Sequence, residues 1–295
     1  MADNVLMPRL DGQRVSVAAI MSQPTWLRAK IAELTEGNEL VSAFFTAQGE
    51  PVQGGGILHP RLKSADRYTA DDVVERAPGD EYQVVRAIDP EYRLAAVRDY
   101  GAKTTITDEE IARGDMAALN NKVLQLTNTL TRKLNTSALA AIDDATPQAV
   151  LAFAAWDTLV TEGPESSLTP STHRPLADMV RARQASEEDR LGIKLDTLLV
   201  STTDAASLRV GYGPQLADVL AAAEVAMITN PYIETGRAYL VQKGKAGVVG
   251  YEAPLTVDVI DRRETRDKVL QVYAVPSYAV DKPQAVKVIT GTVTP

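Results

Sequence analysis

Apolar side chains at helical spacing mark one long helix in the first half of the chain. The stripe recurs every three or four residues, and its members are Met116, Leu119, Val123, Leu126, Leu130 and Leu134. Such spacing places side chains on one face of an α-helix. Thr107 and Glu110 form a capping box, which is typical of a helix start. The sequence therefore predicts a helix over residues 107–142, about 50 Å long at 1.5 Å per residue.

A coiled-coil seam is the alternative interpretation of this stripe. A coiled coil repeats its apolar positions every seven residues over several heptads. The stripe drifts before it completes three heptads, so a single long helix is favoured.

Shorter patterns predict an α+β fold around this helix. Further helices are expected over residues 147–159, 174–190, 202–211 and 215–223. Strands are expected over residues 195–200, 238–241, 246–250, 255–260, 269–275 and 285–289. Ser201 precedes one of the helices, where its hydroxyl can cap the first turn. A turn over residues 242–245 is expected to join two of the strands.

Residues 1–50 carry only short apolar pieces, at 15–21 and 40–45, and no long periodic run. Without such a run, this stretch cannot bury one continuous face. We expect a solvent-facing arm with one or two short helices.

A polar, alternating pattern predicts a long hairpin between residues 51 and 106. Residues 81–85 and 92–98 alternate as strands do, and Pro78 with Gly79 gives a turn signal. Over residues 66–91, eight acids oppose three bases, a net −5 of the chain's −8. Paired catalytic carboxylates are the alternative, but this segment lacks the large apolar side chains that would bury them and raise a pKa. We expect a solvated hairpin supported by something outside its own fold.

Composition excludes several classes of chemistry. The chain has 295 residues, no Cys and only two His, His59 and His173, so thiolate catalysis, Cys-bound metals and His-based triads lack their residues. We expect no cofactor and no metal, and an enzyme using carboxylates is the remote alternative. The acidic balance disfavours tight binding to nucleic acid. No run of about 18 apolar residues predicts a membrane span, so no membrane partner is expected.

The order of these elements resembles the major capsid proteins of tailed double-stranded DNA bacteriophages, which have the Hong Kong 97-type fold. The resemblance covers nearly the whole chain, and the stretches that carry it are residues 100–110, 196–208, 230–241, 274–280 and 289–291. It implies an α+β fold with an N-terminal arm, an extended β-hairpin loop, a peripheral domain with a long spine helix, and an axial domain.

The resemblance also implies boundaries for these parts. The arm would be residues 1–50 and the extended loop residues 51–106. The peripheral domain would combine residues 107–200 and 256–280, with the spine helix at 107–142, and the axial domain would combine residues 201–255 and 281–295.

The function that the resemblance implies is assembly and not catalysis. Chains of this family form hexamers and pentamers that tile an icosahedral shell around the double-stranded DNA genome. The expected location is the virion, after assembly in the bacterial host cytoplasm. The expected partners are other copies of the chain, a portal protein, and scaffolding or cement proteins. An encapsulin-like bacterial nanocompartment is the alternative of a different class.

Contacts between subunits are expected in the loop and the arm. The candidate contact residues are Asp71, Asp72, Glu75, Arg76, Asp80, Glu81, Arg86, Arg9 and Arg14. Some members of the family crosslink their shells through a loop Lys. Residues 66–98 contain five Arg and no Lys, and a guanidinium that stays protonated cannot act as that nucleophile. We therefore expect a shell without such crosslinks.

Overall fold

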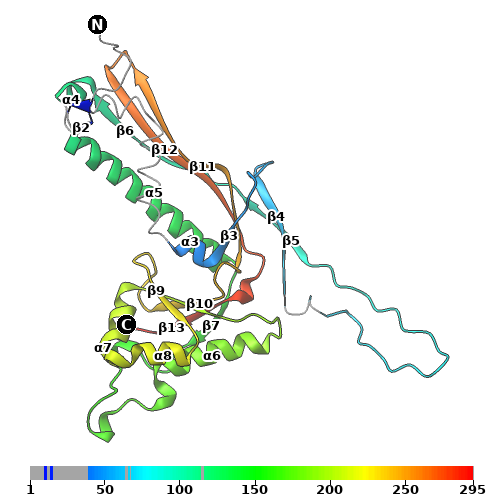
Figure 1. Cartoon of the computed structure of the whole chain (residues 1–295). Helices are drawn as coiled ribbons and strands as arrows, with labels where there is room; N and C mark the ends of the chain where they lie inside the picture. Colours follow the sequence, from blue (N-terminus) through cyan, green and yellow to red (C-terminus); the bar gives the residue numbers. More distant parts are fainter. Residues whose placement is uncertain are drawn as a thin grey trace.

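The structure is a computed structural model that describes residues 10–11, 14–15, 39–63, 66, 68–113 and 116–294 (Figure 1). The described part contains a five-stranded sheet, a four-stranded sheet and two two-stranded sheets, together with one long helix, five shorter α-helices and a projecting loop. The strands are β1 (Leu10–Asp11), β2 (Arg14–Val15), β3 (Phe45–Ala47), β4 (Gly56–Arg61), β5 (Glu91–Ala96), β6 (Tyr100–Thr107), β7 (Gln148–Leu151), β8 (Thr197–Val200), β9 (Ala226–Thr229), β10 (Arg237–Val241), β11 (Gly247–Arg262), β12 (Asp267–Ala279) and β13 (Val286–Thr290). The α-helices are α3 (Glu39–Phe44), α4 (Asp108–Arg113), α5 (Met116–Asp144), α6 (Pro175–Glu188), α7 (Thr202–Tyr212) and α8 (Leu216–Ala222).

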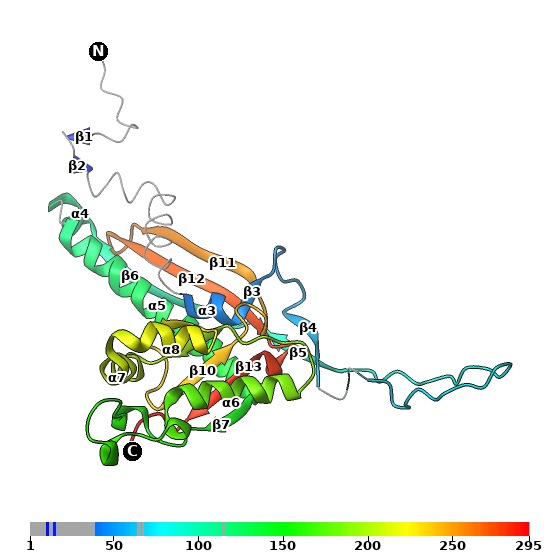
Figure 2. The same cartoon turned by 60° about the horizontal axis from the view of Figure 1, so that its bottom comes forward.

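A five-stranded sheet forms one core, with the strand order β7-β13-β10-β8-β9. Successive side chains of a strand point to opposite faces, and β8 shows the consequence. Leu198 and Val200 pack among α6, α7 and α8, whereas Leu199 packs against α3 and the end of α5. Both faces of this sheet are therefore covered by helices, and Figure 2 shows α6, α7 and α8 gathered around it.

A four-stranded sheet, ordered β3-β11-β12-β6, forms the second core. The long strands β11 and β12 pair antiparallel from Val248 opposite Ala279 to Arg262 opposite Asp267. Helix α5 lies along this sheet in Figure 1. Its first half packs there through Val123, Leu126 and Leu130. Its last turns pack through Leu139 and Ile142 against the other sheet. One helix therefore joins the two cores.

The capping box and the long helix are confirmed. The Thr107 amide donates to Glu110 Oε2 at 3.0 Å, and the Glu110 amide donates to Thr107 Oγ1 at 3.2 Å. Helix α4 starts at Asp108, directly after Thr107, and α5 runs from Met116 to Asp144, so two helices occupy the range predicted as one helix over residues 107–142. At 1.5 Å per residue, α5 alone is about 43 Å long.

The predicted helix over residues 147–159 is wrong. The chain instead forms β7, which pairs parallel with β13, and a single 3₁₀ turn at Trp156–Thr158. Pairing with an existing sheet satisfies backbone groups that the sequence pattern cannot assign to a partner. Trp156 is buried all the same, and its indole Nε1–H donates to Asp178 Oδ2 at 2.9 Å.

The predicted turn over residues 242–245 is confirmed, because it links β10 to β11 and the Lys245 amide donates to the Gln242 carbonyl at 3.0 Å. Strand β10 lies in the five-stranded sheet and β11 in the other, so the turn carries the chain from one core to the next. The two strands expected at 246–250 and 255–260 are one strand, β11, whose register shifts around Ala253. Pro254 follows at this irregularity, where a residue without an N–H is tolerated.

Part of the expected arm belongs to the core. Leu40 and Phe44 of α3 are fully buried. The Phe44 ring packs edge-on against the Tyr239 ring, with the two ring centres 5.6 Å apart. The apolar piece at residues 40–45 was too short to show this by periodicity. The rest of the arm lies largely outside the described residues.

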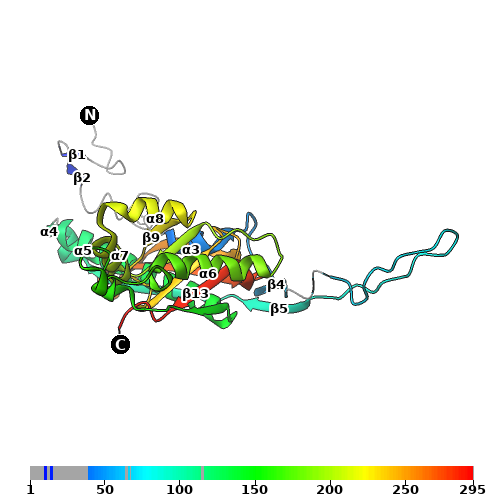
Figure 3. The same ribbon diagram turned by 90° about the horizontal axis from the view of Figure 1, so that it is seen from below.

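The extended loop projects from the body between the end of β4 and the start of β5 (Figure 3). These two strands pair antiparallel, from Gly56 opposite Ala96 to Arg61 opposite Glu91. The turn at Pro78 and Gly79 is confirmed, since the Asp80 amide donates to the Ala77 carbonyl. The strand predicted at residues 81–85 is wrong, because no described residue between 62 and 90 lies in a strand.

Sheet membership divides the chain differently from the predicted boundaries. Residues 107–200 were assigned to the domain of the long helix. Within that range, β7 and β8 are hydrogen-bonded in the five-stranded sheet with β10 and β13. The sheet along which α5 lies therefore contains only the strands β3, β6, β11 and β12.

Candidate assembly surfaces

The extended loop exposes apolar side chains as well as charges. Val73, Tyr82 and Val84 are 82, 78 and 87% exposed. Three large apolar side chains this exposed on one short projecting segment are typical of a surface that another protein covers. The only backbone bond between the two limbs in the described residues joins the Ala70 amide to the Arg86 carbonyl. The loop therefore has little support from its own chain.

Four of the predicted contact residues bond to one another in two pairs within the loop. Asp71 forms an ion pair with Arg86 at 3.2 Å. Arg76 donates to the Asp80 carbonyl and lies 4.7 Å from the centre of the Tyr82 ring. These contacts are exposed, so each adds little to the stability of the free chain.

The structure shows fewer contacts for the other predicted contact residues. Asp72 accepts a bond from the Val73 amide at 2.8 Å. Glu75 and Glu81 are exposed, and neither makes an ion pair within the described part of the loop. Arg9 lies outside the described residues, and Arg14 lies in β2, whose backbone pairs with β1. The structure thus gathers the described loop residues on one projection.

The base of the loop is anchored to the body. The Leu62 amide donates to the Asp281 carbonyl at 2.9 Å, and the Gln284 amide group donates to the Leu62 carbonyl at 2.8 Å. Glu91 pairs with Lys63 at 3.0 Å and with Arg93 at 3.1 Å. Hydrogen bonds from these two cations lower the pKa of Glu91 below its usual 4.5. The direction in which the loop leaves the body is therefore fixed at its root.

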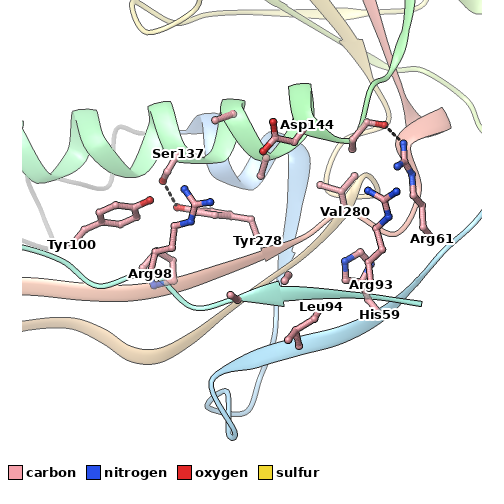
Figure 4. A pocket seen from close by; sticks show the side chains of 16 residues that line it. His59, Arg61, Arg93, Leu94, Arg98, Tyr100, Ser137, Asp144, Tyr278 and Val280 are labelled. Carbon is pink, nitrogen blue, oxygen red and sulfur yellow. Dashed lines mark hydrogen bonds between the residues drawn. The ribbon is translucent and has the colours of Figure 1, made fainter. Parts of the chain in front are cut away.

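A cavity of about 290 Å³ lies beside this base, between β4, β5, α5 and β12 (Figure 4). Arg61 crosses it to donate to the Ala145 carbonyl and to Thr146 Oγ1. It thereby satisfies a carbonyl at the end of α5, where a cation also complements the helix dipole. Arg93 and Arg98 also line the cavity, and among the described residues the only carboxylate in its lining is that of Asp144.

A second cavity, of about 350 Å³, continues along α5 beside the edge strand β6. Tyr100 lines both cavities. Arg132 and Lys133 line the second one, and the Lys133 ammonium lies 5.3 Å from the centre of the Tyr100 ring. Both cavities lie against α5 and share Tyr100, and we call their combined lining the α5 groove.

The α5 groove was not predicted, although the sequence held a signal for it. Residues 116–142 contain three bases, Lys122, Arg132 and Lys133, and no acid. An exposed helix face with charges of one sign is unusual for a surface that only meets water. The apolar stripe identifies only the buried face of the helix and does not report the charge on the rest of its surface.

The buried carboxylates have structural roles. Asp178 accepts from the Trp156 indole and from the Phe153 amide, and Asp204 accepts from Thr292 Oγ1 at 2.6 Å. Each joins segments that are distant in sequence. Among the described residues, no group of three or more His, Asp or Glu could hold a metal ion. Nor is any helix of this part of the chain both long and apolar enough to cross a bilayer.

Comparison with known proteins relates this architecture to viral shells. A family model described as "Phage capsid protein" matches residues 90–289. That stretch runs from the root of the loop through both sheets and α5. No curated protein sequence matches the chain at a significant level.

Solved structures share the fold at low sequence identity. A virus-like particle from Pyrococcus furiosus superposes with a TM-score of 0.61 and 15% identity, covering 89% of this chain and 97% of the other. A chain from Mycobacterium phage Bobi gives 0.61 and 13%, covering 85% and 89%. The capsid of Myoviridae phage XM1 gives 0.55 and 13%, covering 86% and 92%. The Hong Kong 97-type fold predicted from the order of elements is therefore confirmed.

Proposed function

This chain belongs to the phage capsid protein family, and on that premise we propose how its surfaces build a shell. It is a major capsid protein, a structural protein of the virion. We propose that copies of the chain associate as hexamers and pentamers into an icosahedral shell that encloses the phage double-stranded DNA. Assembly takes place in the bacterial host cytoplasm, with a portal protein and with scaffolding or cement proteins as further partners.

One observation carries the proposal, namely an exposed loop that its own chain does not support. Ordering a chain segment costs about 1–2 kcal/mol per residue in backbone entropy. A loop without regular pairing and with exposed Val73, Tyr82 and Val84 gains little in return within a monomer. Contact with a neighbouring copy supplies the missing burial, and Asp71, Asp72, Glu75, Arg76, Asp80, Glu81 and Arg86 are its contact residues. Arg9 and Arg14 of the arm are proposed as a second set.

The two cores correspond to the two domains of the proposed shell subunit. The four-stranded sheet with α5 is the peripheral domain, and the five-stranded sheet is the axial domain. With β7 and β8 in the latter sheet, the boundary between them falls near residue 146 instead of residue 200. The loop between β4 and β5 belongs to neither core.

The shell is proposed to be held without covalent crosslinks through the loop. Residues 66–98 carry Arg but no Lys, so this stretch of the loop lacks the amine that isopeptide chemistry needs. The net charge of −8 also fits a protein that encloses DNA without gripping its phosphates.

Electron microscopy of the purified full chain tests the proposal. Closed shells are expected, together with sedimentation as particles of megadalton mass. Monomers or small oligomers at every concentration tested, with no closed particles, would refute it. Nuclease-protected DNA within particles from infected cells would separate a genome shell from an encapsulin-like compartment, which the family match does not favour.

A further inference from the structure

We infer that a cavity at the root of the loop is a binding site for a small doubly charged oxyanion of the phosphate class. This cavity, of about 410 Å³, lies between the ends of β4 and β5, the residues that follow α5, and β13. We call it the root cavity. The inference goes beyond the proposed function and does not depend on it.

The lining of the root cavity carries an excess of positive charge. Four cations line it against two carboxylates, and these residues are Arg61, Lys63, Arg93, Lys287, Glu91 and Asp189. The difference is two positive charges. A ligand with two negative charges would therefore neutralise the lining.

The way in which the carboxylates are shared shows where the excess lies. Asp189 forms an ion pair with Lys287 at 2.7 Å, so this pair is neutral. Glu91 serves two cations, Lys63 at 3.0 Å and Arg93 at 3.1 Å, which leaves one positive charge at the root of the loop. The second excess charge belongs to Arg61. Its bonds within the described residues go to uncharged acceptors, the Ala145 carbonyl and Thr146 Oγ1.

Two of these cations are held close to each other by the pairing of β4 with β5. Arg61 lies opposite Glu91, and Arg93 lies opposite His59. The two arginines are therefore diagonal neighbours on one face of the ribbon, and Figure 4 shows their side chains pointing the same way. Like charges at this spacing repel each other. An anion between the two guanidinium groups would relieve that repulsion and could bind both forks.

The lining also keeps hydrogen-bond donors without acceptors. Within the described residues Arg61 donates only through Nη2, and Arg93 only through Nε. Lys287 is 1% exposed and uses two of its three N–H groups, on Asp189 and Gln148. Thr146 Oγ1 accepts a bond from Arg61 at 3.0 Å, so its own hydroxyl hydrogen is available. A ligand that matches this set must be rich in acceptors, as an oxyanion is.

The size of the root cavity favours a small ion. A volume of about 410 Å³ holds about a dozen water molecules at about 30 Å³ each. Inorganic phosphate fits this space with some of its water, whereas a nucleic-acid duplex is too wide to enter.

An ion in this cavity would connect separate parts of the chain. Arg61 and Arg93 belong to β4 and β5, Thr146 follows α5, and Lys287 belongs to β13 of the five-stranded sheet. Because the unfolded chain does not bring these residues together, the ligand would stabilise the folded state. It would also hold the root of the loop against the five-stranded sheet.

Titration of the purified full-length chain with sodium phosphate tests the site. Isothermal titration calorimetry in a chloride buffer of constant ionic strength should show one saturable site per chain, with a dissociation constant below about 1 mM. Phosphate should also raise the midpoint of thermal unfolding. Sulfate should compete with phosphate for the site, whereas chloride should not.

Two substitutions should change the affinity in opposite directions. Arg93→Gln removes one excess charge and should weaken phosphate binding at least tenfold. Glu91→Gln raises the excess to three charges and should strengthen binding at least threefold. Loss of folding cannot produce a gain in affinity, so the second variant separates a ligand site from a merely structural role.

Matched controls exclude a general effect of net charge. Arg98 lines the neighbouring cavity but not the root cavity, and Glu264 lies in the turn between β11 and β12. Arg98→Gln and Glu264→Gln should each bind phosphate within about twofold of the original chain. Unfolding curves recorded without phosphate check that all four variants are folded.

Several results would overturn the inference. These are the lack of saturable binding up to about 10 mM phosphate, unchanged affinity in Arg93→Gln, weaker binding in Glu91→Gln, or equal competition by chloride. Displacement of phosphate by a short DNA duplex would also overturn it, because the cations would then belong to a nucleic-acid surface. None of these results bears on whether the chain forms shells, so the proposed function is tested separately.

Discussion

Strand β8 and the loop between β4 and β5 are both extended chain, yet they are stabilised differently. All four residues of β8 are buried, and the strand is paired on both sides, to β10 and to β9. In the loop, Val73, Tyr82 and Val84 are more than three-quarters exposed, and no described residue between 62 and 90 pairs as a strand. One region is supported within the chain, whereas the other is proposed to gain its support from a neighbouring copy. Substitutions should therefore affect folding in the first region and assembly in the second.

Removing matched aromatic rings should give the largest contrast. Phe44 is fully buried and Tyr82 is 78% exposed. Phe44→Ala leaves a large cavity and should destabilise the unassembled subunit by about 4 kcal/mol. Tyr82→Ala should change its free energy of unfolding by less than about 0.5 kcal/mol yet reduce particle yield. Chemical denaturation gives the first quantity and sedimentation the second. Equal destabilisation by the two changes would break the comparison.

The buried ion pair of β13 gives the next largest effect. Lys287 is 1% exposed and donates to Asp189 at 2.7 Å and to Gln148 at 2.6 Å. Asp189→Asn leaves a buried ammonium without its counter-charge and should cost about 3 kcal/mol. Lys287→Met should cost less, because Asp189 keeps partial contact with water. Finding Lys287→Met to be the more destabilising change would argue against this account of the pair.

A smaller contrast comes from two hydroxyl groups. Ser201 caps α7 by accepting a bond from the Asp204 amide at 3.1 Å, in a buried setting. Thr69 donates to the Asp71 carbonyl at 2.7 Å in the exposed loop. Ser201→Ala should cost about 1 kcal/mol, whereas Thr69→Ala should cost less than about 0.5 kcal/mol. Thermal unfolding of the two variants measures the difference, which would vanish if the loop were as well supported as the core.

The smallest effect concerns pH at the root of the loop. The pKa of Glu91 is lowered by Lys63 and Arg93. A carboxyl with a lowered folded-state pKa stabilises the fold above its unfolded-state value, near 4.5, and loses that contribution as the pH falls through the folded-state value. Mild acid should therefore loosen the root of the loop before it affects β8. Titration followed by NMR should place the Glu91 pKa below 4.5, and Glu91→Gln should remove this pH dependence.

The sequence predicted the elements whose signals are local. The capping box of Thr107 and Glu110 and the stripe of α5 depend on residues within a few turns of each other, and both are confirmed. Strand β7 was mistaken for a helix because its pairing partner, β13, lies more than a hundred residues away. Likewise, α3 was placed in the arm because its burial depends on β10 and α5.

The two candidate surfaces differ in the same way, because one depends on local sequence and the other on the fold. The acidity of the loop could be counted, and so its residues could be named. The α5 groove could not, because Tyr100, Lys133 and Arg98 come together only when β6 packs beside α5. A count of charge along the helix indicates a basic surface, but only the fold shows which residues line the α5 groove.

Hydrogen exchange tests most directly whether the loop is supported by a neighbour. Amides of residues 68–90 should exchange nearly as fast as an unstructured peptide in free subunits, and at least tenfold more slowly in assembled shells. Amides of β8 should be protected in both states and serve as the internal reference. Loop amides that exchange equally fast in subunits and in shells would contradict the account.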